Sequence, residues 1–344
     1  MRWVVALVAV LGALPAGAVS LVTEVTGARP FTAISLMGEL ELVKDRTFLT
    51  GCFSSMRSAP LEITGPGTDP ETIDIPRSNQ LCLGLDHGFD DHWRVSVMAS
   101  LTPRVTSQVE MLPRPTLIFR SRSSGAGATL GVAYDSAGLE EVQWGADLGV
   151  AANGYGFSHD WISVLRTIHY QSSLYSLRPS AGVLVAVGDT VVQLRAGYTF
   201  YSQDPLTAGA VSDDELARMD AYFQRLMDAS KYFGLNEQYA SALEASNRLM
   251  ATDALSGLAT APVQLELRPT LQHRFARWLK GQVGYTYDRY VPGAGYAHVA
   301  STKWTVAFGD HVQTWAAASA QVDVPGTVPP QLYGILTLGV EVTF

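Results

Sequence analysis

The chain has 344 residues, of which 47% are hydrophobic and only 16% are charged, so it carries less charge than an average soluble domain. A formal net charge of −8 argues against a nucleic-acid partner, because such partners are bound by basic surfaces. Beyond the N-terminus no apolar run approaches the roughly 20 residues that a membrane-spanning helix needs, which excludes a helical membrane protein.

The N-terminal residues have the pattern of a secretory signal peptide. Arg2 supplies the charged start, residues 4–14 form a short apolar core, and Ala16 and Ala18 are the small residues of a cleavage site. We therefore expect a signal peptide at 1–18 that is removed on export, and a mature chain that begins near Val19.

Alternation of apolar and polar residues recurs along the rest of the chain and predicts β-strands. In 262–272, Val263, Leu265 and Leu267 lie on one face, whereas Gln264, Glu266 and Arg268 lie on the other. The segments with this pattern, in chain order, are 31–43, 47–56, 80–88, 92–102, 105–120, 128–135, 141–153, 173–187, 190–201, 262–272, 278–290, 295–308, 311–323 and 331–344. They amount to about fourteen strands, within a range of roughly 12 to 16.

The length of these segments distinguishes a membrane-spanning β-barrel from a soluble β-sheet protein. Many have 10 to 15 residues, above the 5 or 6 usual in soluble sheets but suited to a tilted strand that crosses a bilayer. Lipid offers no hydrogen-bond partner to an open sheet edge, so such strands must close into a barrel. The predicted fold is a transmembrane antiparallel up-and-down β-barrel at 19–344.

The connections predict which end of the barrel faces which compartment, because periplasmic turns are short and outer loops are long. The turns at 188–189 and 309–310 are expected inside, and the loops at 154–172, 203–261, 292–294 and 324–330 are expected outside. The long connection at 57–79 conflicts with this scheme, since a fourteen-strand count places it inside. Either it is an exception or strands have been missed, with 61–64, 72–75 and 161–170 as the suspects.

The loop at 203–261 is predicted to be a helical hairpin. Ser212 and Glu215 form a capping box, and Leu216, Met219 and Phe223 follow at helical spacing. A second helix is expected at about 237–250. The insert is either a lid or docking element for a protein partner at the outer mouth, or a pair of helices whose apolar stripes simply pack on each other.

Cys52 and Cys82 fall in consecutive predicted strands of an exported chain. The oxidising periplasm would allow them to form a disulfide. The alternative is two separate small residues that face the lumen.

The sequence contains no pattern typical of a catalytic or metal site. A barrel hydrolase needs a nucleophile, a histidine base and an orienting group at one level. Six of the seven histidines are instead scattered over hairpin tips, turns and loops, and His298 lies on a strand of mixed pattern. The cluster Asp86 to His92 could supply metal ligands, yet aspartate and glycine are also common residues of hairpin tips. We therefore predict no enzyme, no cofactor and no metal.

The alternation assigns many charged residues to the inside of the barrel. The predicted lumen-facing charges are Arg94, Glu110, Arg178, Arg195, Glu266, Arg268, Lys280, Asp288, Lys303 and Glu341. About eight strands make a barrel filled by side chains and sixteen leave a channel, so a barrel of about fourteen could hold a narrow aqueous lumen. The alternative is an interior plugged by salt bridges.

The last strand carries a resemblance to a known class. Residues 331–344 alternate apolar and polar side chains and end in phenylalanine, with Tyr333, Leu338, Val340, Val342 and Phe344 as the pattern-bearing residues. This ending resembles that of Gram-negative outer-membrane β-barrel proteins, porins among them, and identifies no subfamily. The resemblance implies a place in outer-membrane lipid and recognition by the barrel-assembly machinery.

Two functions fit these features. The first is a porin-like channel for passive diffusion of small hydrophilic solutes, indicated by the two-signed charged lumen. The second is a non-conducting barrel that docks a partner of an export or cell-surface complex through the 203–261 insert. The fold alone does not decide between them.

Overall fold

The computed structural model describes residues 19–28, 31–58, 61–63, 71–73, 77–111, 117–136, 142–162, 167–205, 263–324 and 330–344. The predicted signal peptide at 1–18 and nearly all of the predicted helical insert lie outside these residues. Within the described ranges, no helix is long and apolar enough to span a membrane.

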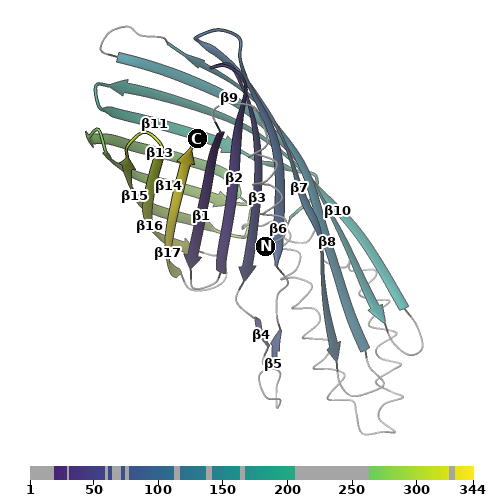
Figure 1. The fold of residues 1–344 in the computed structure, drawn as a ribbon. Helices are drawn as coiled ribbons and strands as arrows, with labels where there is room; N and C mark the ends of the chain where they lie inside the picture. The colour runs from purple at the N-terminus through teal and green to yellow at the C-terminus, as the bar shows by residue number, and fades with distance from the viewer. Residues whose placement is uncertain are drawn as a thin grey trace, which may run out of the picture.

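The described chain forms a closed antiparallel barrel of fourteen strands (Figure 1). The strands are β1 (Val19–Ala28), β2 (Phe31–Val43), β3 (Thr47–Ser58), β6 (Ser78–Gly88), β7 (Trp93–Met111), β8 (Leu117–Asp135), β9 (Val142–Ile162), β10 (Thr167–Val187), β11 (Thr190–Tyr198), β13 (Val263–Ala276), β14 (Leu279–Tyr290), β15 (Tyr296–Phe308), β16 (Val312–Val324) and β17 (Gln331–Thr343). A short β12 (Phe200–Tyr201) continues β11 beyond Thr199, and β4 (Leu61–Ile63) pairs with β5 (Glu71–Ile73) in a separate small sheet.

The barrel closes where its first and last strands meet. β17 pairs with β1 from Ser20 opposite Thr343 to Ala28 opposite Ile335. Every other strand pairs with its neighbours along the chain, which is the up-and-down order that alternating short and long connections predict. Full closure leaves no open edge of the kind that lipid could not satisfy.

The predicted number of strands was correct because two errors cancelled each other: one strand was missed and one was counted in excess. β1 was not predicted, because apolar residues fall on both of its faces, with Val22 on the side of Glu24. The segment 105–120 is not one strand but the end of β7 and the start of β8. Pro103 lies at a register shift between Thr102 and Val105, and β7 continues past it.

With β1 included in the strand count, the long connection at 57–79 no longer conflicts with the rule that periplasmic turns are short. The start of β1 at Val19 and the C-terminal Phe344 share one end of the barrel with the short turns after β2, β6, β10, β13 and β15. We take this end as periplasmic because short turns face the periplasm. The long connection between β3 and β6 then lies at the outer end, together with the connection after β12.

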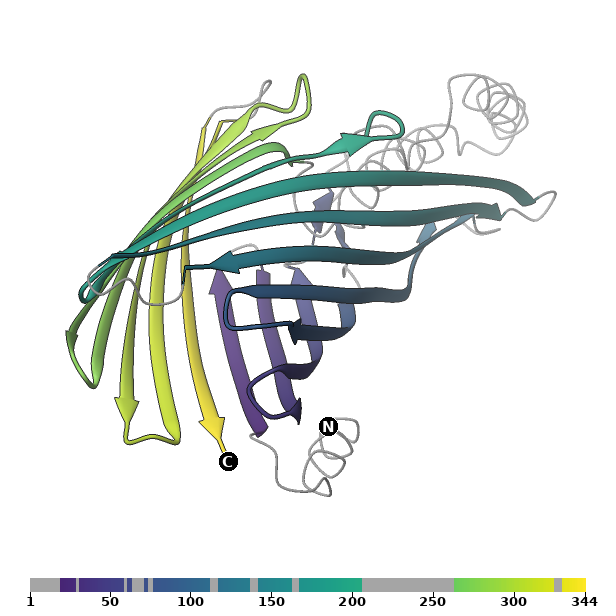
Figure 2. The same cartoon turned by 90° about the horizontal axis from the view of Figure 1, so that it is seen from above.

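Strands β7 to β10 extend beyond the rest of the barrel at its outer end. They have 19 to 21 residues, and Figures 1 and 2 show them projecting past the ends of the shorter strands. At about 3.3 Å per residue they reach roughly 65 Å, twice the hydrocarbon thickness of about 30 Å. The predicted loop at 154–172 was therefore wrong, since β9 runs to Ile162 and β10 starts at Thr167.

The outward face of the strands is apolar. Large apolar side chains such as Leu83, Leu148 and Leu332 are 59%, 66% and 73% exposed. Ring pairs lie near the strand ends, with Trp93 and Tyr134 at the periplasmic end and Tyr287 and Tyr296 nearer the outer end. An apolar band between aromatic girdles is the surface that a membrane-embedded barrel presents to lipid.

Candidate functional site in the barrel lumen

The structure places nine of the ten predicted lumen-facing charges on the face opposite the apolar band. These are Arg94, Arg178, Arg195, Glu266, Arg268, Lys280, Asp288, Lys303 and Glu341. The tenth, Glu110, lies opposite Ile118 beyond the register shift in β7, and its side chain lies outside what the structure describes. A further inward acid, Glu24, lies on the strand that was not predicted.

Two inward charges pair across an intervening strand. Arg195 on β11 forms an ion pair with Asp147 on β9, with Nη2 to Oδ1 at 3.3 Å. Between them lies Gly182 of β10, which is opposite both residues in the two ladders. A Cβ at Gly182 would lie 2.2 Å from Asp147 Oδ1, so with any other residue there the Asp147 carboxylate would have to move from its present position.

The same arrangement recurs one step around the barrel. Arg178 on β10 reaches across Gly197 of β11 to Glu266 on β13, at 3.0 Å from Nη2 to Oε1. A Cβ at Gly197 would lie 2.9 Å from Arg178 Nε. The other oxygen of Glu266 contacts Arg268 Nη2 at 3.3 Å, so one carboxylate bridges two guanidinium groups. Asp288 lies opposite Glu266 in the next ladder.

A third side chain lies over a glycine near the barrel closure. Trp315 on β16 lies over Gly339 of β17 and donates a hydrogen bond from Nε1 to Glu24 Oε1 of β1, at 3.4 Å. Lys303 Nζ sits 4.5 Å from the centre of the Trp315 ring. Glycines on inward faces thus let large side chains lie along the wall rather than across the lumen.

We call the inward face of β9 to β14 the ion-pair wall; it carries Asp147, Arg178, Arg195, Glu266 and Arg268. In each of its ion pairs the arginine is more exposed than the acid. The exposed fractions of the side chains are 54% and 28% for Arg195 and Asp147, 36% and 16% for Arg178 and Glu266, and 49% for Arg268. The guanidinium groups therefore lie nearer to the solvent in the lumen than their carboxylate partners.

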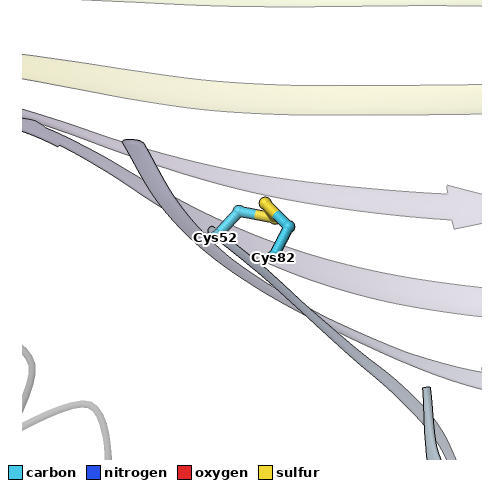
Figure 3. Close-up of a disulfide and its surroundings, with 2 residues drawn as sticks. All are labelled: Cys52 and Cys82. Carbon is cyan, nitrogen blue, oxygen red and sulfur yellow. A yellow bond between two sulfur atoms is a disulfide. The ribbon is translucent and has the colours of Figure 1, made fainter. Parts of the chain in front are cut away.

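A different surface covers β2, β3, β6 and β7, and we call it the disulfide wall. Cys52 on β3 and Cys82 on β6 lie directly opposite each other and are bonded, with the Cα atoms 4.9 Å apart. Figure 3 shows both side chains projecting from the same face of neighbouring strands. Met37 lies opposite Cys52, and Met98 lies opposite Gly84, two residues beyond Cys82.

One ion pair borders the disulfide wall near the periplasmic end. Arg94 Nε lies 3.3 Å from Asp86 Oδ1, and the Arg94 side chain is 56% exposed. As in the ion-pair wall, the cation is the more exposed partner, since Asp86 is 31% exposed.

The Asp86 to His92 cluster forms a turn. Asp90 accepts hydrogen bonds through Oδ1 from the backbone N–H of Trp93 at 2.6 Å and of His92 at 2.8 Å. These two bonds hold the pKa of Asp90 below its ordinary value. In the part of the chain that the structure describes, no three histidine, cysteine or acidic side chains gather in a way that could hold a metal ion.

The pattern-bearing residues of the last strand divide between the two faces. Leu338, Val340 and Phe344 are exposed on the lipid side at 53%, 42% and 73%, whereas Tyr333 lies on the lumen side with Glu341. The alternation of apolar and polar residues did not single out the two glycines that lie beneath the ion pairs. Gly182 and Gly197 each interrupt the inward face of a strand whose other inward positions are polar or larger.

A closed antiparallel barrel with an apolar outer face, a charged inner face and short turns at one end is the architecture of bacterial outer-membrane β-barrel proteins, and this chain has it. No family model and no curated protein matches its sequence. Among solved structures it is similar to the toluene transporter TodX of Pseudomonas putida, with 10% identity, a TM-score of 0.49, and coverage of 97% of this chain and 91% of TodX.

Two structures from Pseudomonas aeruginosa are similar at the same level. A FadL homologue has 8% identity and a TM-score of 0.46, with coverage of 95% of this chain and 88% of the homologue. OccK2 has 8% identity and a TM-score of 0.39, with coverage of 95% and 97%.

Proposed function

We propose that the barrel is a porin-like channel through which small hydrophilic solutes diffuse across the bacterial outer membrane. The observation that carries this proposal is the exposure of the inward arginines. Arg94, Arg195 and Arg268 face away from the lipid band, yet their side chains are 56%, 54% and 49% exposed. A plugged interior would bury them, whereas a water-filled lumen leaves them accessible.

The position of the large inward side chains supports the same proposal. Asp147, Arg178 and Trp315 each lie over a glycine of the adjacent strand. Side chains that follow the wall leave the axis of the barrel free, and charges of both signs along it suit small polar solutes.

The docking alternative rests on the 203–261 insert, of which only residues 203–205 are described, and no observation favours it. We propose in addition that the barrel-assembly machinery recognises β17 together with the C-terminal Phe344, since Leu338, Val340 and Phe344 form one apolar stripe.

A liposome-swelling assay tests the channel. Vesicles that contain the purified barrel should swell in isosmotic solutions of neutral sugars, fastest for a pentose and more slowly for a disaccharide. Vesicles with an eight-stranded barrel, whose interior is filled by side chains, provide the matched control. Absence of swelling with the smallest sugar, in vesicles that hold correctly folded protein, would contradict the proposal.

A further inference from the structure

We infer that the ion-pair wall contains a subsite for small organic anions, centred on Arg195 and Arg268, which recognises a carboxylate group. This inference rests on the proposed channel and names the class of solute that the channel favours. It does not follow from composition, because a chain of net charge −8 would be expected to prefer cations.

The first observation is that two arginines lie opposite each other on paired strands. Arg195 on β11 lies directly opposite Arg268 on β13. Cβ atoms of opposite residues in antiparallel strands are about 4.5 to 5.5 Å apart, and like charges in that position repel each other. A bound anion between the two guanidinium groups would relieve this repulsion.

The second observation is that each arginine is held in place by an acid. Asp147 on β9 draws Arg195 across Gly182, and Glu266 holds Arg268 along β13. These acids are 28% and 16% exposed, whereas the arginines are 54% and 49% exposed. The acids fix the arginines in place while the arginines are what a solute in the lumen meets.

The remaining charges of this region do not reverse that asymmetry. Arg178 adds a third guanidinium group, 36% exposed, on the same Glu266 carboxylate. Asp288 lies opposite Glu266 with its Oδ1 buried, and Asp323 accepts a hydrogen bond from the Tyr290 hydroxyl at 3.0 Å. Three arginines are thus presented to the lumen, and the neighbouring acids are covered or engaged.

Guanidinium chemistry indicates the class of ligand. Each of these ion pairs engages Nη2, and an arginine side chain has five N–H donors in a planar fork. That fork matches the two oxygens of a carboxylate and binds it with charge-assisted hydrogen bonds. Two such forks side by side favour a small carboxylate over chloride, which offers no planar pair of acceptors.

The test measures ion preference and binding separately. In planar bilayers under a potassium acetate gradient, the reversal potential of the unaltered barrel should lie closer to the equilibrium potential of acetate than to that of potassium. Arg195→Gln and Arg268→Gln should each shift it towards the cation side, and the double variant should shift it most. Arg277→Gln in the β13–β14 turn removes an exposed arginine outside the lumen and should leave it unchanged.

Calorimetric titration of acetate into the detergent-solubilised barrel gives the second readout. Each single variant should weaken acetate binding by about tenfold, the loss expected for one charge-assisted hydrogen-bonded contact. A cation-preferring unaltered barrel, or a double variant that binds acetate as tightly as the Arg277→Gln control, would overturn the inference. A barrel that conducts nothing but loses acetate binding in the variants would contradict the channel and uphold the subsite.

Discussion

The disulfide wall links two neighbouring strands, whereas the ion-pair wall links strands that are separated by one other strand. β3 and β13 are opposite each other in the closed strand order, with six strands between them on either side. On β3 and β6 the link is a covalent bond between Cys52 and Cys82. On β9 to β13 the links are ion pairs that cross a glycine, from Asp147 to Arg195 and from Arg178 to Glu266.

This difference separates stability from solute recognition. Ion pairs between solvent-exposed groups contribute about 0 to 1 kcal/mol each, whereas a disulfide stabilises a fold by about 2 to 4 kcal/mol. The disulfide wall therefore contributes mainly to the stability of the folded barrel. The ion-pair wall contributes the charges that solutes meet, so substitutions on the two walls should separate the two properties.

The largest expected effect comes from breaking the disulfide. The double variant Cys52→Ser with Cys82→Ser releases a link between residues 30 apart in the sequence. For a loop of that length the chain-entropy relation gives a loss of about 3 to 4 kcal/mol in unfolding free energy. Denaturant titration of the detergent-solubilised barrel measures this loss, and the reversal potential should stay that of the unaltered barrel. A changed ion preference with unaltered stability would contradict the division between the walls.

A smaller effect is expected from filling the space beneath an ion pair. In Gly182→Ala the new Cβ would lie 2.2 Å from Asp147 Oδ1, so Asp147 must move and release Arg195 into the lumen. The expected results are a loss of about 1 to 2 kcal/mol and a lower open-channel conductance.

Gly51→Ala on β3 is the matched control, since nothing lies within 4 Å of its Cβ position. Equal conductance for the two alanine variants would show that the glycine beneath the ion pair does not keep the lumen clear.

Removing the shared acid of the ion-pair wall should change selectivity more than stability. Glu266→Gln leaves Arg178 and Arg268 without their common carboxylate. Because both arginines are more than one third exposed, water replaces much of the lost interaction and the cost in stability is about 1 kcal/mol. The reversal potential should move further towards anions; a shift towards cations would contradict the account.

The smallest expected effect is at the barrel closure. Trp315→Phe removes the hydrogen bond to Glu24 Oε1 but keeps a ring over Gly339. Loss of one partly exposed hydrogen bond should cost about 0.5 kcal/mol, with conductance unchanged. Denaturant titration and single-channel recording test the two parts, and a large rise in conductance would show that the larger tryptophan ring narrows the lumen.

The alternation of side chains along a strand predicts which charges face inward wherever the strand register is regular. A strand has a period of two, so an apolar lipid face assigns the opposite residues to the lumen, as it did for Arg195 and Glu266. A register shift between Thr102 and Val105 changes which residues of β7 share a face with Arg94, and alternation along the strand does not reveal such a shift. Alternation also failed to reveal β1, where both faces carry apolar residues.

The ion pairs themselves could not be predicted from strand patterns. Arg195 and Asp147 are 48 residues apart and lie on strands that do not pair with each other. Their contact depends on the register of β9, β10 and β11 together and on a glycine in the middle strand. Alternation within one strand contains none of this information, and neither does it indicate which partner of a pair is the more exposed.

Single-channel recording in planar bilayers tests the central claim most directly. The account predicts discrete conductance steps for the purified barrel, because the inward arginines are half-exposed and the large inward side chains follow the wall. The steps should persist in the Cys52→Ser, Cys82→Ser variant and become smaller in Gly182→Ala. A folded barrel that inserts into the bilayer and shows no steps at any voltage would contradict the account.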